Sequence, residues 1–101
     1  MVRLLFAFAF ASSAAHALAQ NRDPNDGRNL AAACATCHGT DGLSQAGMPR
    51  LAGRDRSEIA RLMRDFRSGK RPATVMQQIA RGYSDDQIEA IAAYLSAQKA
   101  K

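Results

Sequence analysis

Apolar residues recur with a helical period over residues 55–69. Four of them stand at the spacings i, i+3, i+4 and i+7, on one face of an α-helix: Ile59, Leu62, Met63 and Phe66. Asp55 or Ser57 can cap the start of this helix, because short polar side chains accept hydrogen bonds from its first free N–H groups. Gly69 suits the left-handed turn that commonly ends a helix. The pattern therefore predicts an amphipathic helix between Asp55 and Gly69.

A second helical pattern begins at Ser84. Ser84 and Gln87 have the spacing of a capping box, and Tyr83 and Ile88 have the spacing of a hydrophobic staple. The apolar stripe that follows comprises Ile88, Ile91, Ala92 and Leu95. We therefore predict a C-terminal helix that begins at these side chains and buries this stripe.

Two shorter helical segments complete the pattern. Residues 23–26 form a turn and capping cluster, and the good helix formers from Leu30 to Cys34 continue it. Further on, Pro72 suits the first turn of a short helix that ends before Gly82. The apolar residues of that helix are Val75, Met76, Ile79 and Ala80. Residues 39–49 are rich in glycine and are predicted to form a loop. No run alternates like a strand, so we predict an all-α domain of about four helices.

The first residues of the chain have the organisation of a secretory signal peptide. A positive start at Arg3 precedes the apolar run from Leu4 to Ala11, and Ala17-Leu18-Ala19 forms an A-x-A cleavage site. A transmembrane anchor is the alternative, but the apolar run is well short of the ~20 residues that cross a bilayer. We therefore expect residues 1–19 to be removed after export to the periplasm. Residues 20–101 would then form one small domain with no membrane span.

The chain is basic, with a formal net charge of +5 at pH 7. Its cations crowd residues 50–71, where eight of them face three acidic residues. The cations are Arg50, Arg54, Arg56, Arg61, Arg64, Arg67, Lys70 and Arg71. The solvated face of an amphipathic helix accounts for such a run, and the functional interpretations are contacts to bound acidic groups or steering toward an acidic partner. Nucleic acid is not expected as the partner of an exported protein.

Two cysteines and a histidine stand together in Cys34-Ala35-Thr36-Cys37-His38. Thiols at this spacing on a helical turn can bond to the two vinyl groups of a porphyrin, and the imidazole that follows can bind its iron. C-x-x-C-H is the signature of covalent haem attachment. Export favours this interpretation, and one covalently held haem c would also stabilise so small a domain.

Other uses of a C-x-x-C motif have less support. A structural zinc site needs four ligands, but the exported chain holds no cysteine or histidine beyond Cys34, Cys37 and His38. A thioredoxin-like site would need a strand beside the motif. The same thiols and imidazole, together with Met76, are soft ligands that suit Cu(I), so copper binding is the minor alternative.

The far side of the haem iron needs a ligand, and no second histidine follows His38. Three methionines remain after residue 19: Met48, Met63 and Met76. Met48 is close to His38 in sequence and Met63 lies in an apolar stripe. We therefore favour Met76, with the other two and an open site as alternatives. Imidazole and thioether ligation predicts one-electron transfer rather than catalysis at the iron. Pro49 is the best candidate for a carbonyl that accepts the second ring N–H of His38.

These residues resemble the class I c-type cytochromes. The likeness covers the exported chain and is carried by C-A-T-C-H-G-T-D-G, M-P-R-L-A-G and M-Q-Q-I-A-R-G-Y-S. It implies a class I cytochrome c fold around one haem, with His38 and Met76 as the axial ligands and Pro49 holding the histidine. Leu51, in the second of these motifs, is expected to contact the haem. Two further positions match the crossing of the family's first and last helices: Gly27 and Tyr94.

The run T-V-M-Q-Q-I-A-R-G-Y-S is similar, more narrowly, to the haem subunit of flavocytochrome c sulfide dehydrogenase. That likeness implies a periplasmic cytochrome subunit that takes electrons from the FAD of a flavoprotein partner during sulfide oxidation. It would pass them to a downstream cytochrome or oxidase. The FAD and the sulfide chemistry would belong to the partner subunit of the heterodimer. A free periplasmic electron shuttle with no permanent partner is the alternative.

Overall fold

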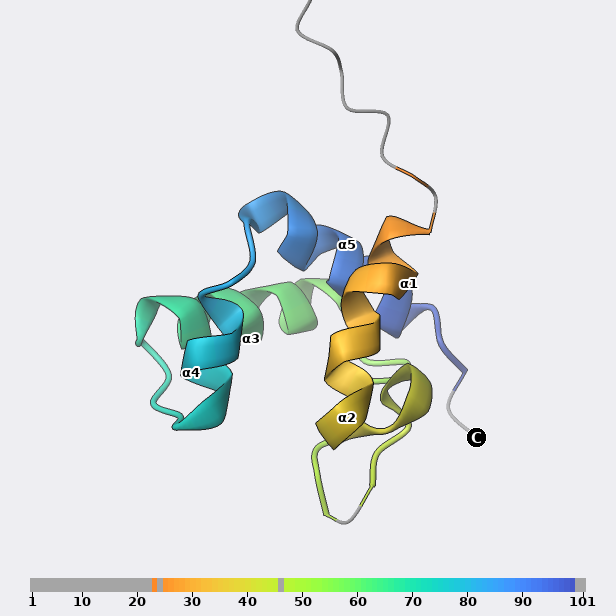
Figure 1. Cartoon of the computed structure of the whole chain (residues 1–101), viewed down its shortest axis with the longest axis horizontal. Coiled ribbons are helices and arrows are strands. Elements are labelled where there is room, and N and C mark those ends of the chain that lie inside the picture. Colours follow the sequence, from red (N-terminus) through yellow and green to blue (C-terminus); the bar gives the residue numbers. More distant parts are fainter. Residues whose placement is uncertain (1–22, 24, 46, 100–101) are drawn as a thin grey trace, which may run out of the picture.

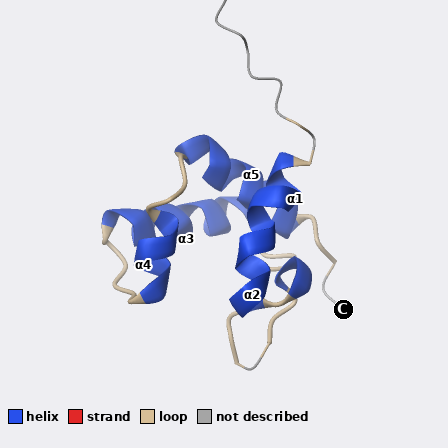
Figure 2. Ribbon diagram, in the orientation of Figure 1, coloured by secondary structure: helices blue, strands red, loops and turns tan. Residues whose placement is uncertain are grey.

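The structure of the chain is a computed structural model that describes residues 23, 25–45 and 47–99. Every regular element in these ranges is helical, which confirms the expected all-α class (Figure 2). The elements are α1 (Asp26–Ala31), the 3-10 turn η1 (Ala32–Cys34), α2 (Ala35–His38), the 3-10 turn η2 (Thr40–Gly42), α3 (Arg56–Ser68), α4 (Val75–Ala80) and α5 (Asp85–Ser96). The expected signal peptide, residues 1–19, lies outside the described residues.

The helices pack in an arrangement centred on α5 and α3. α1 packs against α5, and α3 packs against both α5 and α4. In Figure 1, α2 extends below α1 at one end of the molecule, and α4 lies below α3 at the other. The elements that carry the C-x-x-C-H motif and Met76 therefore lie on the same side of α3 in this view.

The first helical segment runs further than the sequence pattern indicated. It begins after Asp23, whose backbone carbonyl accepts the Asp26 N–H at 2.9 Å and whose carboxylate accepts the Asn25 N–H at 2.8 Å. η1 tightens the helix, and α2 then continues it to His38. Both cysteines and the histidine therefore lie on consecutive helical turns, whereas the sequence placed Cys34 at the end of a helix.

Gly27 of α1 lies directly against α5. A Cβ atom at this position would be 2.5 Å from the carbonyl oxygen of Ala90 and 3.1 Å from the Cβ of Tyr94. Any side chain larger than hydrogen would push the two backbones apart, so the close approach depends on glycine. The expected crossing of the first and last helices at Gly27 and Tyr94 is present.

Side-chain capping starts α3 as predicted. The Asp55 carboxylate accepts the backbone N–H of Glu58 at 3.1 Å, while Ser57 donates its hydroxyl to the same carboxylate instead of acting as the cap. The Ser57 hydroxyl and then the Glu58 N–H lower the pKa of Asp55. At the other end, Gly69 adopts the left-handed conformation with φ +82.

The last two helices differ in how well the sequence placed their starts. Ser84 and Gln87 form both hydrogen bonds of the predicted capping box at the start of α5. α4 begins at Val75, so Pro72 precedes the helix, and its expected place in the first turn is wrong. The chain uses residues 69–74 to reverse direction after α3 before it becomes helical again.

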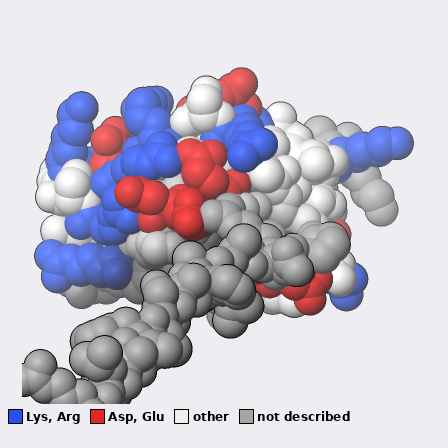
Figure 3. Space-filling model, turned by 90° about the horizontal axis from the view of Figure 1, so that it is seen from above, with Lys and Arg blue, Asp and Glu red and all other residues white. Residues whose placement is uncertain are grey.

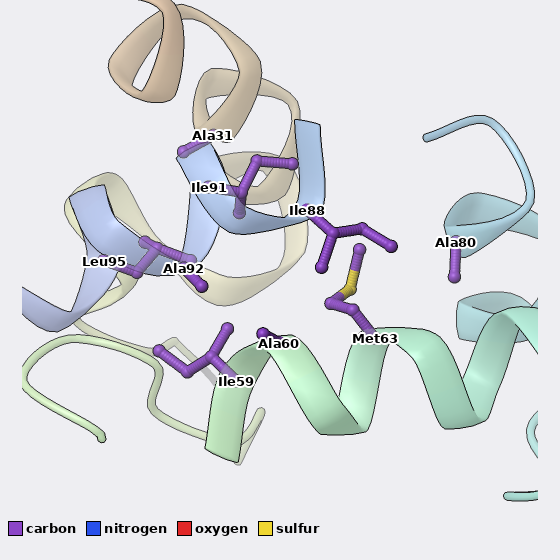
Figure 4. Packing of buried hydrophobic residues seen from close by; sticks show 9 residues of the cluster. All are labelled: Ala31, Ile59, Ala60, Met63, Ala80, Ile88, Ile91, Ala92 and Leu95. Atoms are coloured by element: carbon purple, nitrogen blue, oxygen red, sulfur yellow. The ribbon is translucent and has the colours of Figure 1, made fainter. Parts of the chain in front are cut away.

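Nine buried apolar residues form one core between α1, α3, α4 and α5. They are Ala31, Ile59, Ala60, Met63, Ala80, Ile88, Ile91, Ala92 and Leu95. Figure 4 shows the Met63 side chain of α3 extending toward Ile88 of α5. The stripes predicted for these two helices therefore pack against each other. Full burial of one Ile or Leu side chain stabilises the folded state by about 1.5–3 kcal/mol.

Candidate functional site

His38 is a buried polar side chain at the end of α2. Its side chain is 7% exposed, and its Nδ1 atom lies 2.7 Å from the carbonyl oxygen of Pro49. This is the hydrogen bond expected from the sequence. Because a carbonyl oxygen only accepts, Nδ1 carries the hydrogen of this bond, and in a neutral imidazole the lone pair is then on Nε2. Within the described ranges Nε2 has no hydrogen-bond partner, so it is the ring atom available to a metal.

A tightly bonded loop brings Pro49 to the histidine. Gly39 leaves α2 with φ +82, and a Cβ atom there would lie 3.0 Å from the Ser44 backbone nitrogen. The Ser44 N–H donates to the His38 carbonyl at 2.6 Å, and the Ser44 hydroxyl donates to the Met48 carbonyl at 2.5 Å. The chain therefore doubles back after His38, which positions the Pro49 carbonyl beside the ring.

Cys34 and Cys37 are free thiols at i and i+3 of the helical segment that ends at His38. Cys34 is half-buried, and this burial raises the pKa of its thiol. Cys37 is exposed. Because residues three apart are neighbours on a helix surface, both sulfurs are offered on one side of the segment. This arrangement suits two thioether bonds to one flat ligand.

The three methionines considered as the second axial ligand lie in different environments. Met63 is 7% exposed inside the core, so packing accounts for it. Met48 is 37% exposed and lies in the same loop as Pro49. Met76 is half-buried on α4, at the edge of the core. The loop after α2 thus brings Pro49 close to His38, whereas Met76 comes from a separate element.

Partly covered apolar side chains surround these residues. Seven of the described residues pack against the core without being fully buried: Leu30, Cys34, Leu51, Phe66, Met76, Tyr83 and Tyr94. On α4, Val75 is 59% exposed and Ile79 is 39% exposed. Burial of the phenol is the larger cause of the raised pKa of Tyr83, and the nearby Cys34 is the second. Tyr83 therefore lies near Cys34, although the two are far apart in sequence.

Nothing in the sequence pattern placed Tyr83, Val75 or Ile79 at the site. Val75 and Ile79 are spaced i and i+4, which places them on one face of a helix. This spacing is the feature of the sequence that could have indicated an apolar surface there. Ala80 of the same helix is fully buried, so α4 turns one edge to the core and leaves the neighbouring apolar edge open. Such a surface suits an apolar ligand or a partner.

A structural zinc site has no support in the part of the chain that the structure describes. No group of three or more histidine, cysteine, aspartate or glutamate side chains is placed there to hold a metal ion. A structural zinc site needs four such ligands.

Most of the clustered arginines are paired with acidic residues, largely those of α5. Arg64 bonds to Glu89 and lies 3.6 Å from Asp85, and Arg67 bonds to Asp85 at 2.5 Å. Three further pairs are Arg54–Glu58, Arg56–Glu89 and Arg61–Asp65. Figure 3 shows acidic side chains set among the basic ones. This finding supports the solvated-face interpretation for most of the cluster.

Three cations near α4 differ from the rest. Within residues 23, 25–45 and 47–99, no ion pair involves Lys70, Arg71 or Arg81, although Arg71 lies over the Phe66 ring at 5.5 Å. No acidic residue occurs between Asp65 and Asp85. Around α4, these three described cations therefore leave positive charge that no ion pair neutralises.

Comparisons with known proteins give the family. Residues 23–95 match the family model described as cytochrome C oxidase, cbb3-type, subunit III. A thiosulfate dehydrogenase electron acceptor from Stutzerimonas stutzeri is 51% identical over 77 residues, which cover 73% of this chain and 36% of that protein. The cytochrome subunit of sulfide dehydrogenase from Chlorobaculum tepidum is 41% identical over 68 residues, which cover 67% of this chain and 62% of that protein.

A solved structure of cytochrome c4 from Acidithiobacillus ferrooxidans has a TM-score of 0.65 and 33% identity, with 71% of this chain and 49% of that chain covered. The helical fold and the C-x-x-C-H segment thus define a small c-type cytochrome. The chain belongs to the class I c-type cytochrome family and is similar to cytochrome c4. Membership of this family implies a covalent haem c.

The two curated relatives described above are longer than this chain. The chain spans 36% and 62% of the lengths of the two curated relatives described above. Among the residues that the structure describes, none of the helices is both long and apolar enough to cross a bilayer.

Proposed function

We propose that Cys34 and Cys37 hold the haem through thioether bonds and that His38 and Met76 bind its iron from opposite sides. The observation that carries this proposal is the 2.7 Å hydrogen bond between His38 Nδ1 and the Pro49 carbonyl. A carbonyl that accepts from one ring nitrogen fixes the imidazole and leaves the other nitrogen for a metal. Leu51, in the same loop, contacts the haem in this proposal.

The residues around the motif fit a large, mostly apolar group. Val75 and Ile79 are exposed apolar side chains on the element that also carries Met76. Covering such side chains stabilises a protein by about 25 cal/mol for each Å² of apolar surface removed from water. A covalently held haem supplies that cover, which a single metal ion such as Cu(I) would not.

When bound, the haem supplies a reversible one-electron change at its iron. His38 and Met76 would both bind the iron, which would leave no position on it for a substrate. The Pro49 carbonyl fixes the orientation and basicity of the His38 ring, and the aliphatic side chains limit the access of water. These roles describe electron transfer rather than catalysis.

The electrons are proposed to come from a dehydrogenase that oxidises a reduced inorganic sulfur compound. Two relatives support this by their names, a cytochrome subunit of sulfide dehydrogenase and a thiosulfate dehydrogenase electron acceptor. The first candidate is a heterodimer with an FAD-containing flavoprotein that oxidises sulfide, with a downstream cytochrome or oxidase as electron acceptor. The second candidate donor is a thiosulfate dehydrogenase. Its support is the 51% identity to the thiosulfate dehydrogenase electron acceptor, against 41% to the sulfide dehydrogenase subunit.

The haem is tested on the purified full chain, expressed in a host that attaches haem c. We expect a pyridine haemochrome spectrum shifted by thioether linkage and a pigment that stays with the protein in acidified organic solvent. The double variant Cys34→Ser, Cys37→Ser is the matched control and should yield no covalent pigment. A colourless wild-type protein, or one that holds stoichiometric copper without haem, would overturn the proposal.

The electron donor is tested by mixing the oxidised cytochrome with each dehydrogenase and its substrate. Reduction by the sulfide-oxidising flavoprotein, with co-elution of flavin and haem in gel filtration, would support the heterodimer. Reduction by thiosulfate dehydrogenase without a stable complex would favour a free carrier for that enzyme. No reduction by either enzyme would overturn the sulfur-compound assignment and leave the carrier role intact.

Export with removal of residues 1–19 is part of the proposal. Its support is the sequence pattern of a positive start, an apolar run and an A-x-A site. Intact-mass analysis of protein from the periplasmic fraction should give a chain that begins at Gln20 and carries one haem. A cytoplasmic protein that retains Met1 would contradict this part.

A further inference from the structure

Both ends of the loop that follows His38 are bonded to the last turns of α5. At the first end, the Tyr94 hydroxyl donates to Asp41 Oδ1 at 2.5 Å. At the second end, the Gly53 N–H donates to the Leu95 carbonyl at 3.0 Å. Two consecutive residues of one long helix therefore hold the segment 39–53.

Asp41 adopts a conformation that few side chains accept. Its backbone has φ 55 and ψ 21, in the left-handed region. Aspartate and asparagine enter this region more readily than other side chains, but they do so mainly where the surroundings hold them. The hydrogen bond from Tyr94 provides such a hold, because it fixes the Asp41 side chain to a helix outside the loop.

The turn that contains Asp41 sets the spacing between His38 and Pro49. The N–H of Gly42 donates to the Gly39 carbonyl at 2.9 Å, immediately after His38. The Gly42 carbonyl in turn accepts the N–H groups of Leu51 at 2.9 Å and Ala52 at 3.0 Å, shortly after Pro49.

There is also little free space at this turn. A Cβ atom on Gly42 would lie 3.0 Å from both Leu51 Cβ and Leu95 Cδ2. A displacement of the turn would therefore also displace the segment that contains Pro49. The Pro49 carbonyl would then move relative to the His38 ring.

We propose that Tyr94, acting through Asp41, is a positioning residue for His38. The Tyr94 hydroxyl anchors the turn, the turn fixes residues 49–52, and the Pro49 carbonyl then fixes the imidazole. The inference rests on the proposed role of His38 as an iron ligand. Tyr94 of α5, 53 positions from Asp41, would then help to fix the orientation of the His38 ring.

The test compares four variants of the haem-loaded protein. Tyr94→Phe removes only the hydroxyl, and Asp41→Gly removes the carboxylate while relieving the backbone conformation. Asp41→Asn keeps an oxygen that can accept the Tyr94 hydroxyl. Ser84→Ala is the matched control, since it removes a hydroxyl from the opposite end of α5 and loosens that end of the helix alone.

The readouts are hydrogen exchange at His38 Nδ1, the NMR shifts of its ring and the reduction potential. We expect exchange to be about tenfold faster in Tyr94→Phe and Asp41→Gly, as for the loss of one hydrogen bond. The ring shifts and the potential should change in the same two variants. Asp41→Asn and Ser84→Ala should resemble the wild type.

Two results would overturn the inference. One is wild-type exchange and potential in Tyr94→Phe and Asp41→Gly. The other is equal acceleration in Ser84→Ala, which would mark a general loss of stability. If Tyr94→Phe fails to fold, Asp41→Gly carries the test alone. Haem attachment is read separately by the haemochrome spectrum, so a wild-type protein without pigment counts against the proposed function and not against the positioning role.

Discussion

Arg67, near the end of α3, donates a hydrogen bond to the carboxylate of Asp85 in the first turn of α5 at 2.5 Å. The same guanidinium donates to the Tyr83 carbonyl at 3.2 Å. One side chain thus joins two helices at the point where the chain enters α5. It does so between residues that are 18 positions apart, so the bond contributes to tertiary structure rather than to a single helix.

This ion pair predicts an acid dependence of stability. Arg67 is the largest cause of the lowered pKa of Asp85. A carboxyl with a depressed pKa in the folded state contributes stability above its usual value of about 3.9 and loses it as the pH falls through the lower, folded value. Asp85→Asn should therefore be less stable than the wild type in urea at pH 7, and the difference should shrink as the pH is lowered through the acid range. Equal stability at pH 7 would show that solvent screening cancels the pair.

The close approach at Gly27 predicts a large effect from one methyl group. In Gly27→Ala the new Cβ would lie 2.5 Å from the Ala90 carbonyl oxygen, so α1 and α5 must separate. We expect a loss of about 1–3 kcal/mol in the free energy of unfolding, as for other overpacked sites. Gly82→Ala is the control, because its Cβ would meet its nearest neighbour at an ordinary 3.4 Å. Similar stabilities for the two variants would contradict the crossing.

Replacement of the proposed second axial ligand gives a spectroscopic prediction. Met76→Ala should abolish the weak charge-transfer band of a thioether bound to ferric haem and should lower the reduction potential. Met48→Ala is the control and should keep the band. If the band survives in Met76→Ala, the ligand is Met48 or Met63 instead. The measurement is the near-infrared absorption spectrum of the oxidised protein.

The chain's two tyrosines, Tyr83 and Tyr94, should ionise at high pH only. The hydrogen bond to Asp41 is the largest cause of the raised pKa of Tyr94, and burial is the largest cause for Tyr83. A raised pKa contributes stability that is complete below the usual value of about 10 and is lost as the pH rises through the folded value. An ultraviolet titration should show phenolate formation above about pH 10, and Asp41→Ala should shift one step to lower pH.

The unpaired cations near α4 predict a salt-dependent encounter with an acidic electron donor. Lys70→Glu combined with Arg81→Glu should slow the second-order reduction rate by about tenfold at low ionic strength, and high salt should remove most of the difference. Lys99→Glu, on an exposed residue near the end of α5, is the single-charge control. Because Lys99→Glu changes half as much charge as the double variant, a fall half as large in the logarithm of the rate would attribute the effect to net charge alone.

The sequence predicted the local features of the fold because their determinants lie within a few residues of one another. The capping box of Ser84 and Gln87 and the left-handed Gly69 depend only on neighbouring backbone groups. The bond between His38 and Pro49 was also predicted, because the chemistry of a histidine ligand requires an acceptor. The roles of the haem-site residues themselves stay predictions.

The features that the sequence could not supply depend on tertiary contacts. Several arginines of the basic run pair with carboxylates of α5, which the local sequence does not indicate. Arg64 and Glu89, for example, are 25 positions apart. The bond between Tyr94 and Asp41 spans 53 positions, and nothing in either local pattern indicates it. Pro72 was placed inside a helix because its backbone angle suits a first turn, whereas the length of chain needed to reverse after α3 decided the actual start.

The packing of α1 on α5 has a consequence for the order of events in assembly. Contacts between segments so far apart in sequence form only after the entropy of closing a long loop has been overcome. The crossing at Gly27 therefore has to wait until α5, the last of the described helices, has been synthesised. Until then Cys34 and Cys37 stay on a segment that has not docked, so both sulfurs are accessible for the proposed thioether bonds.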